Sequence, residues 1–127
     1  MQETKPSVIV DAYLDAVRDR DFERARSFLA DRGFLAISPI ARFDDADAFM
    51  ADVERASAIL ARIATRLRFC NENDVCHVLD VTVSLGAYST VTVVSLLRVR
   101  DGYIARVESI FDAREYQRMF GDLEPLS

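Results

Sequence analysis

The chain has few of the residues from which metal sites and disulfide frameworks are built. Its 127 residues include one histidine and two cysteines. Cys76 and His77 are adjacent, so on a strand their side chains would point to opposite faces and could not share a metal ion. We therefore expect no metal and no other cofactor. Cys70 could form a disulfide with Cys76 only in one register of the turn between them, and a cytoplasmic setting favours free thiols.

Long apolar runs and clusters of basic residues are also missing. No segment approaches the 18 apolar residues expected of a membrane-spanning helix, and the N-terminus has neither the cationic nor the apolar part of a secretory signal. The net charge is −5, and the 16 basic residues are scattered among acids. This pattern argues against nucleic acid and membrane as partners. A cytoplasmic location is the default expectation.

Linkers rich in proline or glycine are absent, so residues 1–127 are expected to form a single domain. The first part of the chain has helical patterns. Thr4 or Ser7 is the expected N-cap of a first helix with Pro6 in its first turn, and apolar residues follow at helical spacing. Asp21 is expected to begin a second helix, which Gly33 ends.

A short strand is expected from Phe34 to Ile37, stopped by Ser38-Pro39. Asp44 or Asp45 then caps a third, longer helix, whose apolar side is expected to run as far as Leu67. From there the apolar period changes to two, which predicts strands at about 67–71, 75–84, 90–100 and 103–111.

The clearest single signal is the pair Asp101-Gly102 between two alternating apolar runs. A two-residue hairpin turn needs positive φ at both positions, and Asp-Gly is among the pairs that adopt it most readily. Asp112 is expected to open a short helix after the hairpin. The predicted fold class is α+β, with a cone-shaped, curved antiparallel sheet wrapped on three N-terminal helices.

Two of the predicted strands are apolar on both faces: 75–84, and 90–100 within its residues 91–99. Helices can cover only one of these faces. We expect a second copy of the chain to cover the other, which makes a homodimer through the sheet face. The alternative is a monomer that tolerates scattered exposed valines and leucines.

Three segments resemble known proteins: VIVDAYLDAVRDRDFERARSFLAD near the start, the strand that ends at Ser38-Pro39, and LLRVRDGYIARVESIFDAREYQ near the end. Together they resemble the nuclear transport factor 2-like superfamily, in its SnoaL-like and ketosteroid-isomerase-like branch. The resemblance covers about residues 6–120. It implies a fold that encloses a hydrophobic pocket, but it does not imply one reaction, because such folds host many functions.

The ketosteroid isomerases of this superfamily suggest roles for individual positions. The resemblance implies that Tyr13 matches the tyrosine of their oxyanion hole. Their catalytic aspartate corresponds here to Ser38, or to Ile37 if the match is shifted by one residue, and their second acid corresponds to Ser95. A serine cannot abstract an α-proton unaided at neutral pH, so classical steroid isomerisation is not expected.

The same match implies which strand faces line the pocket. It places Cys76, Val78, Asp80 and Thr82 there, and His77 with its alternate neighbours on the dimer side. A carboxylate within an apolar strand can act as a general acid or base, so Asp80 is a candidate catalytic residue together with Tyr13. Alternatively, Asp80 pairs with Arg66 or Arg68, or accepts a hydrogen bond from Tyr13, only to satisfy its own charge.

Two functions are compatible with these features. The first is a small acid/base enzyme of the isomerase, cyclase or hydrolase type, acting on a hydrophobic, cyclic or polyketide-like substrate through Asp80 and Tyr13. The second is a non-catalytic ligand-binding or assembly domain. In both cases a small hydrophobic molecule, neutral rather than acidic, is the expected ligand. The residues expected to bind it are Ser38, Phe49, Val78, Ser95, Ser109 and Phe111, within a wall that also includes Phe28, Phe34, Leu60, Val93, Leu97 and Val107.

Overall fold

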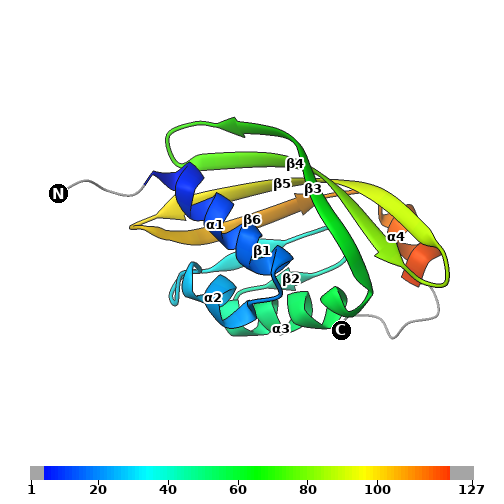
Figure 1. The fold of residues 1–127 in the computed structure, drawn as a ribbon. Coiled ribbons are helices and arrows are strands. Elements are labelled where there is room, and N and C mark those ends of the chain that lie inside the picture. The colour runs from blue at the N-terminus through cyan, green and yellow to red at the C-terminus, as the bar shows by residue number, and fades with distance from the viewer. Residues whose placement is uncertain (1–4, 121–127) are drawn as a thin grey trace.

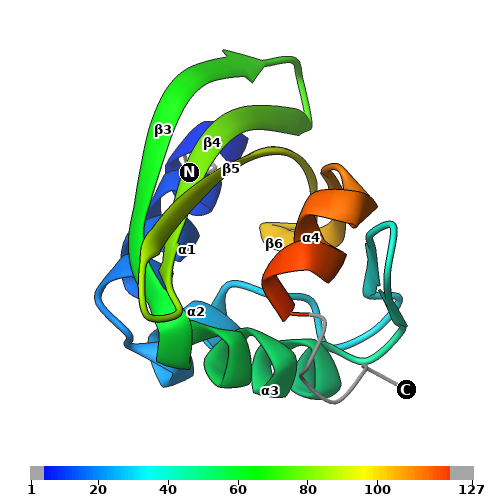
Figure 2. The ribbon, with the colours of Figure 1, turned by 90° about the vertical axis from the view of Figure 1, so that its right-hand side faces the viewer.

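The computed structural model describes residues 5–120 and shows helices packed on one face of a curved sheet (Figure 1). In Figure 2 the strands β3 to β5 curve over α1, and α3 faces the concave side of the sheet. The helices are α1 (Pro6–Arg18), α2 (Phe22–Ser27), α3 (Ala46–Ala56) with a 3-10 turn η1 (Ser57–Ile59), and α4 (Ala113–Phe120). The strands are β1 (Leu35–Ile37), β2 (Arg42–Phe43), β3 (Leu60–Cys70), β4 (Asp74–Ser84), β5 (Tyr88–Arg100) and β6 (Tyr103–Ile110).

The six strands form one sheet in the order β2-β1-β6-β5-β4-β3. The four long strands β3 to β6 pair antiparallel in chain order, as predicted. The short strand β1 pairs parallel with β6, so the sheet is mixed rather than purely antiparallel. It does not close into a barrel, because β2 and β3 are its two edges. The predicted α+β cone is confirmed, with this difference in strand direction.

The turn between β5 and β6 has the predicted geometry. Asp101 and Gly102 have φ values of 54° and 84°, and Arg100 pairs with Tyr103 across them. Positive φ at both positions is what a type I′ hairpin turn requires.

The helix starts agree with the sequence at most positions. Asp21 caps α2 by accepting a hydrogen bond from the Arg24 amide at 3.2 Å, and Asp45 caps α3 through the Asp47 amide at 3.0 Å. Pro6 is the first residue of α1, which makes its predecessor Lys5 the N-cap.

The sequence predicted Thr4 or Ser7 as the N-cap of α1. Ser7 is not the N-cap, because the fixed φ of Pro6 already places that proline in the first helical position. Thr4 lies outside the described residues.

The third helix is shorter than predicted. It ends at Ala56, and Leu60, Ile63 and Leu67 belong to β3 instead. Two register shifts in the β3–β4 pairing break the strict alternation of β3, so apolar residues three or four apart occur in a strand. Pairing with β4 thus overrides a pattern that, taken alone, is typical of a helix.

The register between β4 and β5 decides which side chains face the helices. Residues directly opposite each other on neighbouring strands share a face. His77 pairs with Ser95 and Leu79 with Val93, and these side chains face α1 and α3, on what we call the inner face. Asp80, paired with Thr92, lies on the outer face.

The faces predicted for β4 are therefore wrong. Residues Cys76, Val78, Asp80 and Thr82 lie on the outer face, whereas His77, Leu79, Val81 and Val83 lie on the inner one. Ser84 pairs with Tyr88 across a three-residue loop, and this loop sets the register. A slip of one residue relative to a neighbouring strand inverts the face of every side chain on the strand.

Cys70 pairs with Val75, and Cys76 pairs with Phe69. Because these pairs are consecutive, the two cysteines point to opposite faces. Both are free thiols.

The main core lies between α1 and one half of the inner face. Its most completely buried side chains are Val10, Leu29, Val75, Leu97 and Ile104. Beyond this core the same strands continue over space that side chains do not fill.

Candidate functional site

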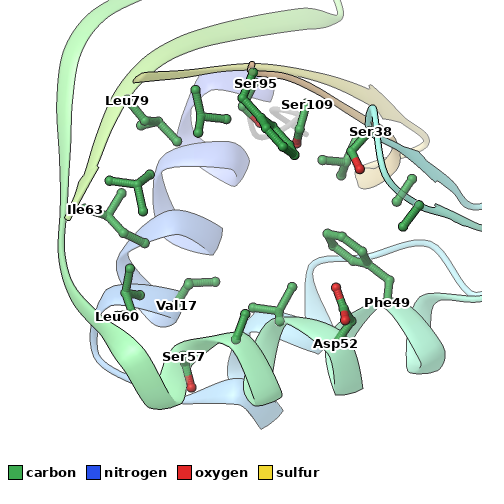
Figure 3. Close-up of a pocket in the computed structure, with 18 of the residues that line it drawn as sticks. Val17, Ser38, Phe49, Asp52, Ser57, Leu60, Ile63, Leu79, Ser95 and Ser109 are labelled. Atoms are coloured by element: carbon green, nitrogen blue, oxygen red, sulfur yellow. The ribbon is translucent and has the colours of Figure 1, made fainter. Parts of the chain in front are cut away.

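A cavity of about 330 Å³ lies between the inner face of the sheet and the helices α1 and α3 (Figure 3). Its wall is mainly aliphatic and aromatic. Apolar side chains of β4 and β5 form the sheet side of the wall together with β6, and side chains from α1, α3, β3 and the segment from β1 to β2 form the other sides. Representative wall residues are Val17, Phe49, Ile63, Leu79, Val81 and Val93.

Two serine side chains lie together at the sheet side of this cavity. Ser95 on β5 and Ser109 on β6 are direct cross-strand partners, and both lie on the same side of the cavity in Figure 3. Tyr13 of α1 also lines the cavity. We call Tyr13, Ser95 and Ser109 the hydroxyl end.

The hydroxyl end is available to a ligand. Within residues 5–120, no protein group forms a hydrogen bond with the side chains of Tyr13, Ser95 or Ser109. Burial raises the pKa of the Tyr13 phenol above its ordinary value, so this hydroxyl stays protonated and can donate at neutral pH. Three potential donors thus face the cavity without a protein partner.

A charged pair lies on the opposite side, on α3. Arg55 donates from Nη2 to Asp52 Oδ1 at 2.7 Å, one turn along the helix. The Asp52 side chain is 21% exposed and that of Arg55 is 50% exposed, and both residues line the cavity. In Figure 3, Asp52 points from α3 toward the sheet, across the cavity from Ser95 and Ser109. We call Asp52 with Arg55 the carboxylate end.

Two other serines of the wall already have protein partners. The Ser38 hydroxyl, just after β1, accepts a hydrogen bond from the Ile40 amide at 3.3 Å. The Ser57 hydroxyl donates to the Glu54 carbonyl at 2.6 Å. These contacts stabilise the local turn and the end of α3.

The structure brings most of the predicted site residues to this cavity. Six of them line it: Tyr13, Ser38, Phe49, Ser95, Ser109 and Phe111. Leu60, Val93 and Val107 of the predicted wall also line it. Leu97 and Phe34 are buried in the packed core, and Phe28 packs against it, so these three do not reach the cavity.

Asp80 and Val78 lie on the outer face, which corrects their predicted position in the pocket. Arg66 donates to the Asp80 carboxylate from Nη2 at 2.5 Å and from Nε at 3.2 Å, and Thr92 donates to it at 3.2 Å. The Arg66 guanidinium holds the pKa of this carboxyl below its usual range. The alternative interpretation of Asp80, an acid paired with arginine, is the one that the structure shows.

His77 was predicted to lie on the face opposite to the pocket, and this prediction is wrong. It is buried on the inner face, only 3% exposed. Its Nδ1 is 3.2 Å from the Thr65 hydroxyl. Its Nε2 is 3.3 Å from Asp11 Oδ1, without the alignment of a hydrogen bond. Burial lowers the pKa of the imidazole, although Asp11 opposes this effect.

His77 and Ser95 do not form a nucleophile–base pair. Although they are cross-strand neighbours, both ring nitrogens of His77 face other groups, and His77 does not line the cavity. Catalysis by an activated serine would need a hydrogen bond between these two side chains, and none is present.

Asp52 and Arg55 were not found from the sequence. A signal was present, because Asp52 lies three residues after Phe49 and one before Val53, two members of the apolar stripe of α3. Residues three apart on a helix share a face. The acid therefore flanks the stripe that borders the cavity.

The remaining expectations concern metals, membranes and location. Across residues 5–120, no group of three or more histidine, cysteine or acidic side chains is placed to bind a metal ion. In the same part of the chain, no helix has the length and apolar character needed to cross a membrane. The cytoplasmic location and the absence of nucleic-acid partners stay predictions.

Sequence comparison alone gives no relatives: no protein-family model matches the chain, and no curated protein is similar to it in sequence. Solved structures do match. An NTF2-like protein from Cytophaga hutchinsonii is 21% identical, with a TM-score of 0.77, over 91% of this chain and 96% of that one. A protein with a ketosteroid isomerase-like fold from Catenulispora acidiphila is 15% identical, with a TM-score of 0.77, over 96% and 100% of the two chains.

A third match is a protein from Shewanella denitrificans that is provisionally assigned as a SnoaL-like polyketide cyclase. It is 9% identical, with a TM-score of 0.73, over 92% of this chain and 97% of that one. All three similarities extend over nearly the whole length of both chains and concern the arrangement of helices and strands. The chain therefore has the fold of the nuclear transport factor 2-like proteins, the group to which the SnoaL-like and ketosteroid-isomerase-like structures belong.

Proposed function

We propose that this protein binds a compact, mainly apolar small molecule in the cavity, and that the ligand carries a hydrogen-bond acceptor such as a carbonyl oxygen. The observation that carries this proposal is the hydroxyl end: three hydroxyls that have no protein partner within residues 5–120, in a mainly apolar wall. Apolar ligand surface gains about 25 cal/mol for each Å² removed from water. A buried donor left without a partner is costly, so an acceptor on the ligand adds both affinity and orientation.

Binding is better supported than ketosteroid isomerase chemistry. By the resemblance, the two acids of those enzymes correspond here to Ser38 and Ser95, and Asp80 lies on the outer face. The cavity wall nevertheless contains Tyr13 and one carboxylate, Asp52. An acid/base enzyme of the cyclase, isomerase or hydrolase type is therefore the second candidate, with Tyr13 donating and Asp52 accepting a proton on opposite sides of a substrate.

The structural neighbours support a small organic ligand in either case. The Catenulispora protein is in complex with trimethylamine, and the Shewanella protein is provisionally assigned as a cyclase of polyketides. Both share only the fold with this chain. The Catenulispora structure supports the proposal because it holds a small organic molecule within this fold.

The test compares two probes that differ only in an acceptor, 2-acetylnaphthalene and 2-ethylnaphthalene. Titration calorimetry on the wild type and on Tyr13→Phe gives their dissociation constants. Loss of one neutral hydrogen bond is expected to weaken the acetyl probe about 3- to 10-fold in Tyr13→Phe. The ethyl probe should bind both proteins equally.

The control is Tyr103→Phe, since Tyr103 is exposed and does not line the cavity. This change should leave both probes unaffected. If neither probe binds the wild type, the cavity is not a site for compact apolar ligands and the proposal fails.

We also propose that a second copy of the chain covers the outer face of the sheet. Leu67, Val78, Val94 and Ile110 are consecutive cross-strand partners, one on each of β3 to β6. Leu67 is 50% exposed and Ile110 48% exposed. An apolar row at the centre of an uncovered sheet face is typical of an interface between copies.

Sedimentation velocity at tens of micromolar tests this dimer. The wild type should sediment as a dimer and Val94→Arg as a folded monomer, because a buried, unpaired guanidinium opposes association. A wild-type protein that is monomeric at this concentration would contradict the proposal.

A further inference from the structure

The two polar groups of the cavity have opposite hydrogen-bonding character. The hydroxyl end offers donors, whereas Asp52 offers a carboxylate on the opposite side of the apolar space. Asp52 is the one acidic residue in the part of the cavity wall that the structure describes. A ligand that spans the cavity therefore meets two different kinds of partner at its two ends.

The Asp52 carboxylate has capacity left for a ligand. Arg55 occupies Oδ1, and among residues 5–120 no side chain or amide donates to Oδ2. Asp52 is also the more buried member of the pair, at 21% exposure against 50% for Arg55. The carboxylate thus lies closer to the apolar interior, and the guanidinium lies closer to solvent.

A ligand that occupies the cavity would remove water from Oδ2. Taking a carboxylate oxygen out of water is costly unless a hydrogen-bond donor replaces the water. A donor on the ligand would form a charge-assisted hydrogen bond, the stronger kind. An anionic group at the same place would meet a like charge.

We propose that Asp52 determines specificity at this site by binding a hydrogen-bond donor, a hydroxyl or amine group, at the end of the ligand opposite to its acceptor. The ligand class is then a compact apolar molecule with a carbonyl at one end and a hydroxyl or amine at the other. The proposal rests on the proposed function, since it needs a ligand held at the hydroxyl end. Arg55 acts as a positioning residue that holds Oδ1 and leaves Oδ2 free.

The test uses 2-acetylnaphthalenes that carry hydroxyl, methoxy or carboxylate at position 6. The acetyl group is common to all three, so differences between them report the carboxylate end alone. In the wild type the hydroxyl probe should bind about 10-fold or more tightly than the methoxy probe, as expected for a hydrogen bond to a charged group. The carboxylate probe should bind most weakly.

Asp52→Asn keeps the size of the side chain and removes its charge. The preference for hydroxyl over methoxy should fall to about 3- to 10-fold, the range of a neutral hydrogen bond, and the carboxylate probe should gain affinity. Glu54→Gln makes the same carboxyl-to-amide change two residues away on α3, at an exposed position outside the cavity wall. It should leave all three affinities as in the wild type. A thermal melt of each variant confirms that it is folded.

The outcomes separate this inference from the proposed function. If the acetyl probes bind and Tyr13→Phe weakens them, but Asp52→Asn leaves the hydroxyl-to-methoxy ratio unchanged, the role of Asp52 is wrong and the binding function stands. If the carboxylate probe binds the wild type best, Arg55 rather than Asp52 selects the ligand and the inference is overturned. If no acetylnaphthalene binds, the proposed function fails, and this inference fails with it.

Discussion

The two halves of the inner sheet face have the same kind of side chains, but one half packs in the core and the other lines the cavity. In one half Val75, Leu97 and Val99 pack against α1 and are almost completely buried. In the other half Leu79 and Val93, on the same two strands, line a cavity. Valine and leucine occur in both halves, so composition does not separate them. The difference lies in what faces each residue across the curved sheet: packed side chains in one half and the cavity in the other. Residues of the first half stabilise the fold, and residues of the second half can contact a ligand.

The largest effect on the free energy of unfolding is expected from leucine-to-alanine substitutions, one in each half. Leu97→Ala should lower the free energy of unfolding by about 2–5 kcal/mol, the cost of removing a leucine from a filled core. Leu79→Ala should cost about half as much, because its side chain already lacks neighbours on the cavity side. Urea unfolding of both variants measures the difference. Equal losses would mean that the two halves are packed alike.

The second effect concerns His77, which lies at the boundary between the halves. Its pKa is lowered by burial, with Arg68 and Arg18 acting in the same direction and Asp11 against them. The native state therefore binds fewer protons than the unfolded state, whose imidazole titrates near pH 6.5. The stability that neutral His77 provides is present above about pH 6.5 and is lost as the pH falls.

Between pH 7 and pH 5 the free energy of unfolding should fall, with a contribution from His77 of at most about 1.4 kcal/mol per pH unit. His77→Gln should flatten this part of the profile, since glutamine does not titrate. Denaturation at a series of pH values measures both slopes. Profiles that stay parallel would show that His77 does not titrate differently in the two states.

The third effect is expected from a larger side chain in the half of the inner face that lines the cavity. Val81→Phe adds a ring where the cavity has room, so we expect the free energy of unfolding to change by less than about 1 kcal/mol instead of the usual 1–3 kcal/mol cost of overpacking. The acetyl probe should no longer bind, because the ring takes its space. Val99→Phe, in the filled half, is the control and should show the full overpacking cost. Retained binding by Val81→Phe would place the ligand elsewhere.

The smallest effect is expected on the outer face. Asp80→Asn removes one partner of an ion pair near solvent, and such pairs contribute little to the free energy of unfolding. Stability should change little, and the affinity for every probe should be unchanged, since Asp80 is not part of the cavity wall. A strong loss of binding in this variant would contradict the observed register of β4.

Local signals in the sequence predicted much of this fold. The Asp101-Gly102 turn and the caps at Asp21 and Asp45 depend on residues close together in the chain, and the structure has them as predicted. The strand character of residues 60–66 was missed because it depends on pairing with β4, which the sequence of that segment does not contain.

The site was harder to predict than the fold. It depends on which face of the sheet each strand residue occupies and on where side chains leave a cavity. One register choice at the β4–β5 loop moved Asp80 out of the predicted pocket and brought Leu79 in. The spacing from Phe49 places Asp52 beside the apolar stripe of α3, but the local sequence does not show that this stripe borders a cavity. The hydroxyls of Ser95 and Ser109 reached the cavity as expected, since the face of each follows from the hairpin turn between β5 and β6.

The parallel pairing of β1 with β6 has a consequence for folding kinetics. Ala36 and Val107, both buried partners in this pairing, are about 70 residues apart in the chain. The hairpins from β3 to β6 close short loops and can form early, whereas this contact must close a long one and is expected late. A small molecule in the cavity would then find its site only after the main folding barrier has been crossed. It should slow unfolding while leaving the folding rate nearly unchanged.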